Sequence, residues 1–328
     1  MKTISTLTLL MITLAMAAGC QPQIVESDGT VLYTDSRVND WKTPYGMGRR
    51  IQTANYSVFT TSGGSLARDT IPAFLEACRR NYLDLTGLEA KSLPTSMPVY
   101  VLASRNQWLS LTRTIVGERA MGRFMAIQNG GYCYRDVCVY WVMHGMSTLL
   151  VAAHEGMHQF LYHYLEDQLP VWMEEGLCTL AEGYPVGEKH VYFAHDMNVA
   201  RFADLQSAIA RNFWLSMDEL LPMNSGGPDG PYTETRTAFY GQLWALVHFL
   251  RHDDRYSEGF RRMLADAAQG RLNEALGVDK ATMNRMRRSG HIYNRSVSVP
   301  LFKYYINSDL ETFEKEFREY ATRLAQMM

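Results

Sequence analysis

The sequence predicts an α+β fold, in which a small mixed sheet with helices precedes a mostly helical half. Two observations support this class. Before about residue 143, short runs rich in β-branched and aromatic residues alternate with helical stretches, and from Ser147 onward apolar residues recur every three or four positions. Strands that come early in the chain and helices that come late are typical of α+β proteins.

The elements of the first half follow from local patterns. We expect an irregular lead-in over 21–50, with a loop at 45–50. Five further elements are expected before residue 147: strands over 56–61 and 97–104, helices over 66–88 and 106–116, and strand and hairpin material over 124–142.

The first functional pattern is "VAAHEGMHQF" at residues 151–160, within a helix expected over 147–166 and capped by Ser147 or Thr148. His154 and His158 are one helical turn apart, so both imidazoles project from one face and can reach the same zinc ion. Glu155 is displaced by one residue. A carboxylate beside the metal, rather than on it, can act as a general base toward water.

A catalytic zinc ion usually takes a third protein ligand and keeps its fourth position for water. The segment "LPVWMEEGLCTLAEG" at 169–183 predicts a second helix, in which Pro170 suits the first turn and Gly183 marks the end. Returning antiparallel to the first helix, it can bring a carboxylate to the metal. Spacing alone leaves Glu174 and Glu175 as alternatives.

These two segments resemble the gluzincin pattern of thermolysin-like zinc peptidases, and most closely the peptidase MA-like group of bacterial proteins, which includes families of unknown function. The resemblance covers about residues 55–265. It implies a thermolysin-like zincin core within a peptidase domain over 51–270, with 271–328 as a helical extension packed on it. It also implies Glu175 as the third zinc ligand, because the ligand precedes a glycine in this pattern. Cys178 departs from the alanine usual at its position.

Two further features would serve a peptidase. Tyr240 lies in "FYGQLW", which resembles the family's Tyr-x-Gln segment, and could donate a hydrogen bond to the oxyanion; the alternative is an ordinary core tyrosine. The strand material over 124–142 could pair with an extended peptide, a mode of binding that the resemblance also implies.

The N-terminus predicts export. Residues 1–20 combine one lysine, an apolar run and small residues, as in a secretory signal peptide. "AAGC" resembles a bacterial lipobox, so Cys20 is the expected lipidation site of an outer-membrane lipoprotein facing the periplasm or cell surface. Cleavage after Ala17 would instead give a soluble periplasmic or secreted protein.

The remaining cysteines and the charge complete the expectations. Cys133 and Cys138 lie in a predicted hairpin and are expected to form a disulfide in an oxidising compartment, the alternative being two reduced thiols. Cys78 and Cys178 are expected as buried thiols. The net charge is −2 with both signs interspersed, which gives no support to nucleic-acid binding.

The sequence therefore predicts a zinc-dependent peptidase of the bacterial envelope, anchored to a membrane by its N-terminal lipid, with one Zn²⁺ per chain and peptides or proteins as substrates. The alternative is a non-catalytic envelope lipoprotein that retains the fold for binding or assembly. Glu155 favours the enzyme, because a purely structural metal site needs no base beside its ligands.

Overall fold

The computed structural model of the chain describes residues 23–24, 35–144, 146–183, 190–191, 193–194, 197–225, 234–288 and 290–327. The expected signal peptide at 1–20 and the expected lipidation site Cys20 lie outside the described residues.

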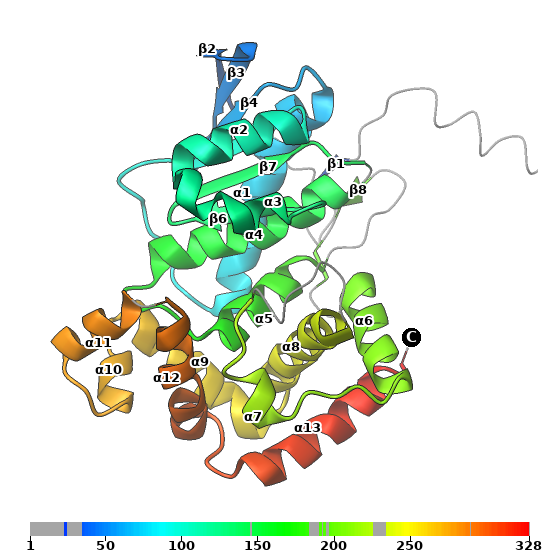
Figure 1. The fold of residues 1–328 in the computed structure, drawn as a ribbon, viewed down its shortest axis with the longest axis vertical. Coiled ribbons are helices and arrows are strands. Elements are labelled where there is room, and N and C mark those ends of the chain that lie inside the picture. The colour runs from blue at the N-terminus through cyan, green and yellow to red at the C-terminus, as the bar shows by residue number, and fades with distance from the viewer. Residues whose placement is uncertain are drawn as a thin grey trace, which may run out of the picture.

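A six-stranded mixed sheet forms the first half of the molecule, with the order β2-β3-β4-β5-β7-β6 (Figure 1). The strands are β2 (Arg37–Thr43), β3 (Gly46–Gln52), β4 (Tyr56–Thr60), β5 (Met97–Leu102), β6 (Gly131–Tyr134) and β7 (Val137–Trp141). The pairs β4–β5 and β5–β7 are parallel, and the outer pairs β2–β3, β3–β4 and β6–β7 are antiparallel. A separate parallel pair joins β1 (Gln23–Ile24) to β8 (His190–Val191).

Helices cover both faces of this sheet. Along β5, Val99 and Val101 pack with α1 (Ile71–Thr86) and α4 (Ser147–Tyr164), whereas Tyr100 and Leu102 face the opposite side. On that side lie α2 (Arg105–Val116) and α3 (Met121–Met125). A π-helical turn, Leu66–Thr70, leads directly into α1.

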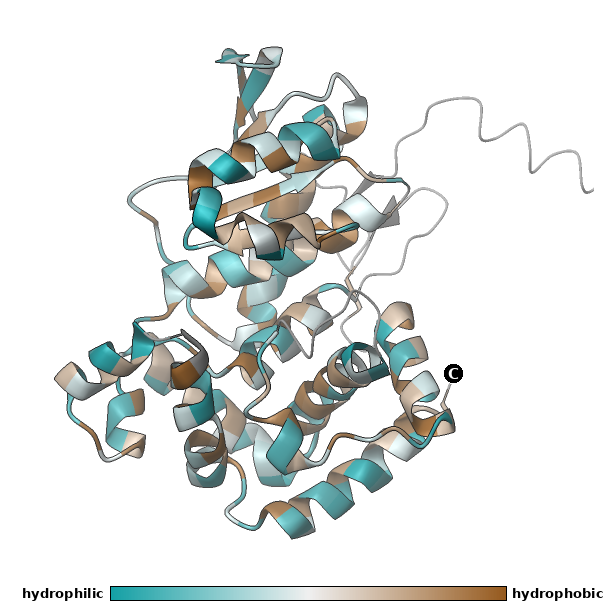
Figure 2. Ribbon diagram, in the orientation of Figure 1, coloured by the Kyte–Doolittle hydropathy of each residue, from teal (hydrophilic) through white to brown (hydrophobic). Residues whose placement is uncertain are grey.

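The second half is helical. Its helices are α5 (Val171–Ala181), α6 (Val199–Ala210), α7 (Met217–Leu220), α8 (Glu234–His252), α9 (Asp254–Ala268), α10 (Leu272–Ala275), α11 (Lys280–Arg287), α12 (Gly290–Tyr305) and α13 (Leu310–Leu324). Most residues of α5 and of α8 are buried, because other elements of the fold surround both helices. Figure 2 shows that the middle of α8 is hydrophobic and that polar residues lie at its ends. The α+β arrangement expected from the sequence, with a sheet first and helices after it, is confirmed.

Two local expectations were wrong. The last part of the lead-in predicted as irregular, including the loop expected over 45–50, belongs to the hairpin β2–β3, an edge of the sheet. Its strand β2 is largely exposed and carries Arg37, Asp40 and Lys42, so it lacks the apolar alternation that marks a strand. Likewise, residues 124 and 125 belong to α3, so the expected strand begins only at Gly131.

The C-terminal helices pack on the rest of the fold, since α13 contacts α8 and α12 contacts both α5 and α9. Within the described part of the chain, no helix has the length and apolar character needed to cross a membrane.

Candidate metal centre

The two histidines lie on α4, on the side that packs against α5. Their ring centroids are 5.1 Å apart, which is the separation expected for side chains one turn apart on a helix. The expected side-chain cap of α4 was wrong, because the helix begins after Met146 without one. Instead, the Thr148 hydroxyl hydrogen-bonds both backbone groups of Met143 and ties the first turn to the end of the sheet.

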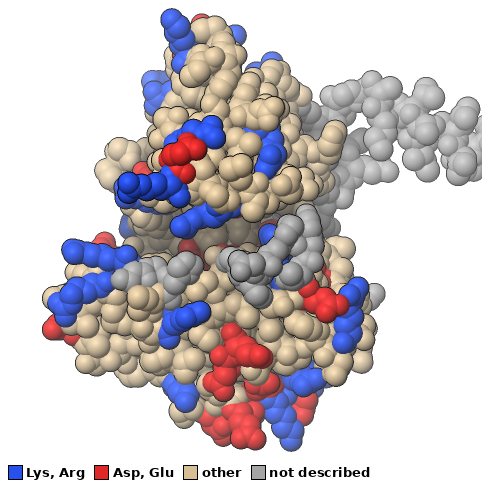
Figure 3. Space-filling model, in the orientation of Figure 1, with Lys and Arg blue, Asp and Glu red and all other residues tan. Residues whose placement is uncertain are grey.

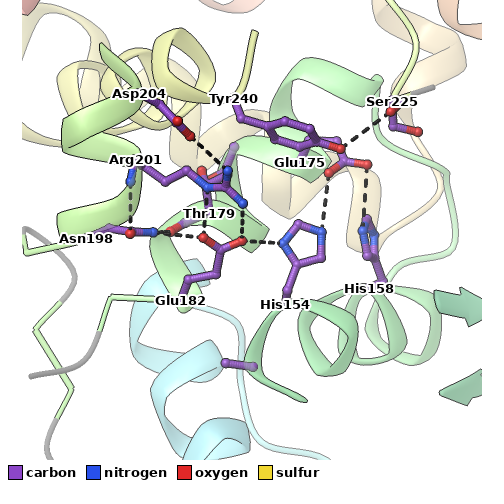
Figure 4. A network of polar contacts seen from close by, with 12 residues as sticks. His154, His158, Glu175, Thr179, Glu182, Asn198, Arg201, Asp204, Ser225 and Tyr240 are labelled. Atoms are coloured by element: carbon purple, nitrogen blue, oxygen red, sulfur yellow. Dashed lines mark hydrogen bonds and ion pairs between the residues drawn. The ribbon is translucent and has the colours of Figure 1, made fainter. Parts of the chain in front are cut away.

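Glu175 meets this histidine pair from α5. Pro170 has extended backbone angles before Val171, so the loop ends there and the helix starts with Glu174 in its first turn. The Glu175 carboxylate lies between the two rings: one oxygen is 3.4 Å from His154 Nε2 and the other is 3.8 Å from His158 Nε2. The structure therefore brings together the three side chains that were predicted as ligands (Figure 4).

The spacing of His154 and Glu175 fits a zinc ion, whereas His158 Nε2 lies somewhat farther away, at 3.8 Å from Glu175 Oε1. Two donors bound to one tetrahedral zinc at about 2.0–2.1 Å lie about 3.3 Å from each other. The 3.4 Å between His154 Nε2 and Glu175 Oε2 matches that spacing. In addition, Glu175 Oε2 is buried and forms no hydrogen bond, and its contact with His154 Nε2 at 3.4 Å is an ion pair only when His154 is protonated. A buried carboxylate oxygen without a partner is costly, and a cation at this point would compensate it.

Cys178 is a neighbour of this cluster that the sequence did not predict as a ligand. Its sulfur and one nitrogen of each histidine all lie within 4.8 Å of one another. Burial raises the pKa of the Cys178 thiol, so it holds its proton more firmly than an exposed cysteine does. Burial also opposes ionisation of Glu175, but its contact with His154 and the charge of His158 hold the Glu175 pKa below its usual value. Glu175 is therefore the better anionic ligand.

Two other carboxylates orient the histidines. Glu174 Oε1 lies 2.8 Å from His158 Nδ1, and Glu182 Oε1 lies 2.7 Å from His154 Nδ1. A carboxylate at Nδ1 keeps the proton on that nitrogen and leaves Nε2 free to bind a metal. Glu174, the alternative ligand in the sequence, thus faces the far side of His158. Glu182 was missed, although it lies two turns beyond Glu175 on the same face of the helix.

Glu182 is in turn held by α6. Both of its oxygens accept hydrogen bonds from Arg201, and Oε2 also accepts one from Asn198 Nδ2. Burial alone would raise the pKa of Glu182, but Arg201 and the hydrogen bond to His154 lower it to about 2.

Glu155 lies beside the cluster, as predicted for a base. Burial raises its pKa, and the nearby His154 and His158 partly offset that effect. The backbone of Cys133, on β6, lies close enough to the Glu155 carboxylate to lower its pKa. The Cys138 thiol, on β7, donates to the Glu155 backbone carbonyl at 3.1 Å. The end of the sheet thus positions this residue.

Tyr240, on α8, lies next to Glu175 in Figure 4. Its hydroxyl is 3.4 Å from the Ser225 carbonyl oxygen, and burial raises its pKa, so the hydroxyl stays protonated as a donor. The guanidinium groups of Arg201 and Arg236 lie 4.8 and 5.8 Å from the centre of its ring. The structure therefore brings this predicted donor to the cluster.

Cys133 and Cys138 face each other across the β6–β7 hairpin, as Cα partners in the ladder. The connection is tighter than the sequence suggested, because only Arg135 and Asp136 separate the strands, and Arg135 takes a left-handed conformation with φ of 58°. The two residues are thus neighbours across the hairpin, as the disulfide requires. Both sulfurs are free thiols in this structure, and the disulfide stays a prediction.

Figure 3 shows a recess between the sheet-bearing half and the helical half, at the level of α4 and α5.

The sequence matches no protein-family model, and no curated protein is significantly similar to it.

Proposed function

We propose that this protein is a zinc-dependent peptidase with a thermolysin-like zincin core, in which His154, His158 and Glu175 hold the metal. One observation carries the proposal: two imidazole Nε2 atoms converge on a single buried carboxylate whose Oε2 has no hydrogen-bond partner, with a further glutamate beside them. A bound zinc ion would supply Lewis acidity, polarising the attacking water and the carbonyl of the substrate.

Glu155 acts as the general base. Its carboxylate accepts the proton of the attacking water and then delivers it to the nitrogen of the departing amine. The partial burial that raises its pKa suits both steps, because a base is most effective when its pKa approaches the working pH.

The substrate is an extended peptide. Among the described residues, β6 pairs with β7 on one side and with no strand on the other, so its free edge can accept a peptide by strand addition. The same strand places the backbone of Cys133 near the Glu155 carboxylate, so this edge lies next to the base. Tyr240, across the cluster on α8, would donate a hydrogen bond to the oxyanion.

We also propose that the protein acts in the bacterial envelope, exported by its signal peptide and anchored through a lipidated Cys20. The rival function is a non-catalytic lipoprotein that binds a partner or metal with the same fold. Glu155 argues against the rival, since binding alone requires no base beside the ligands.

The deciding experiment compares the wild type with Glu155→Gln. The variant should bind one zinc ion per chain and should hydrolyse a quenched-fluorescent peptide library at least about 100-fold more slowly, because general-base catalysis typically contributes 10²–10⁴-fold. Zinc content is measured on the same samples, and chelator treatment followed by zinc addition serves as the activity control.

Unchanged turnover by Glu155→Gln would refute the mechanism. A wild type that carries stoichiometric zinc but cleaves no peptide in the library would favour the non-catalytic lipoprotein.

A further inference from the structure

Arg201 occupies an unusual position between the candidate metal centre and α6. Its Nε and one terminal nitrogen donate to the two oxygens of Glu182 at 2.9 and 2.8 Å, and the other terminal nitrogen donates to Asp204 at 3.1 Å. The side chain is only 21% exposed. All of these contacts require the planar, forked guanidinium group, which lysine cannot reproduce.

The contacts of Glu182 determine which proton His154 carries. Arg201 and Asn198 donate three hydrogen bonds to the carboxylate, so it acts there only as an acceptor. The remaining contact, to His154 Nδ1 at 2.7 Å, must therefore be an N–H donating to Glu182. With its proton on Nδ1, His154 would bind a metal ion through Nε2, the nitrogen that faces Glu175.

The other side of the same guanidinium faces Tyr240, at 4.8 Å from the centre of its ring. Cation–π contact of this kind favours one placement of the ring. Asn198 completes the arrangement, because it caps α6 through Arg201 N and donates to the Thr179 carbonyl of α5. The start of α6 is thus fastened to α5 next to the metal centre (Figure 4).

We propose that Arg201 is a positioning residue, which fixes His154 in its metal-binding tautomer through Glu182 and holds Tyr240 over the same site. It touches neither metal nor substrate. The inference rests on the proposed zinc site and adds a residue from α6 that controls both the affinity of that site for metal and the placement of its oxyanion donor.

The test measures zinc affinity by competition with a chromophoric chelator, for the wild type, Arg201→Lys and Arg201→Gln. Both variants should bind zinc about 10–100-fold more weakly, the usual consequence of losing a partner behind a metal ligand. Lysine keeps the positive charge beside Glu182 and Asp204, so Arg201→Lys should stay folded, which thermal denaturation checks. The matched control is Arg211→Gln, which removes an exposed arginine at the other end of α6 and should leave zinc affinity unchanged.

Two further measurements separate positioning from general stabilisation. The loss of zinc affinity in the single variant Glu182→Gln should equal the loss in the double variant that also carries Arg201→Gln. The second substitution should add nothing, because Arg201 acts on the metal site through Glu182. With saturating zinc, Arg201→Lys should lower kcat more than it raises KM, since a displaced Tyr240 weakens binding of the transition state rather than of the substrate.

Arg201→Lys and Arg201→Gln variants that bind zinc as tightly as the wild type would overturn the positioning role while leaving the zinc site intact. A wild type that binds no zinc would overturn the proposed function as well.

Discussion

At the scale of single residues, the chemistry of the centre depends on Glu175 and Cys178, which lie one turn apart on α5 and both reach the histidine pair. The two side chains differ in what burial costs them. A buried carboxylate needs cations or donors for its oxygens, and Glu175 Oε2 forms no hydrogen bond and has only His154 Nε2 at 3.4 Å beside it. A buried thiol behaves as a small apolar group and tolerates that environment. The need for a metal therefore lies with Glu175.

We predict that Glu175→Gln lowers zinc affinity by more than about 100-fold. Replacing a metal ligand costs more than removing a residue that only hydrogen-bonds a ligand, which typically lowers metal affinity about 10–100-fold. Cys178→Ala should bind one zinc ion per chain with affinity close to that of the wild type. Equilibrium competition with a chelator measures both. The reverse pattern, in which the cysteine variant alone loses the metal, would make sulfur the third ligand.

At the scale of elements, α5 carries Glu175 and lies between α4 and α8 with almost no space to spare. A Cβ atom built at Gly176 would lie 2.2 Å from Val247 Cγ2 of α8. Gly156 on α4 has a similar role, because a Cβ there would lie 2.5 Å from the Tyr82 hydroxyl, which donates to the Ala153 carbonyl. These glycines set how closely the helices approach, and hence where the ligands meet.

Gly176→Ala should therefore destabilise the protein by about 1–3 kcal/mol, the usual cost of overpacking a core. It should also weaken zinc binding, because α5 must move and Glu175 moves with it. Gly122→Ala is the matched control: nothing lies within 4 Å of its added Cβ, so no loss of stability or of zinc affinity is expected. Denaturant unfolding and chelator competition provide the two readouts. Wild-type values for Gly176→Ala would show that α5 has more freedom than its packing indicates.

Some of these elements could be predicted from the sequence and others could not. The helix with His154 and His158 was predictable because its apolar period is regular, and Glu175 followed from the resemblance that the two helical segments carry. The strand β2 was not predictable, because it has no apolar pattern. Hydrogen bonds to β3 and the contact of Trp41 with Phe59 stabilise it instead. The role of Arg201 could not be predicted from the sequence either. Its role depends on the folded approach of α6 to Glu182, 19 residues earlier in the chain.

At the scale of the whole molecule, the last helix is joined to the metal centre through a continuous core. Phe313 on α13 is fully buried against Phe302 of α12 and Phe249 of α8, with ring centroids 4.8 and 5.7 Å apart. The same helix α8 carries Tyr240 and supplies Val247 behind Gly176. The C-terminal extension expected from the sequence therefore supports the helix that backs α5.

This connection predicts that the described chain unfolds as one unit. Phe313→Ala should destabilise it by about 3–5 kcal/mol, the range for removing a buried phenylalanine side chain. The loss of helix, measured by far-ultraviolet circular dichroism, should coincide with release of bound zinc along the denaturant curve, in the wild type and in the variant alike. The coincidence follows because weakening α13 removes the support of α8, and with it the position of α5. Ile292→Ala, at a side chain that is 63% exposed, should change stability by no more than about 0.5 kcal/mol and serves as the control. A first transition that removes helix from Phe313→Ala while zinc remains bound would show that residues 271–328 unfold on their own and that the core divides near residue 270.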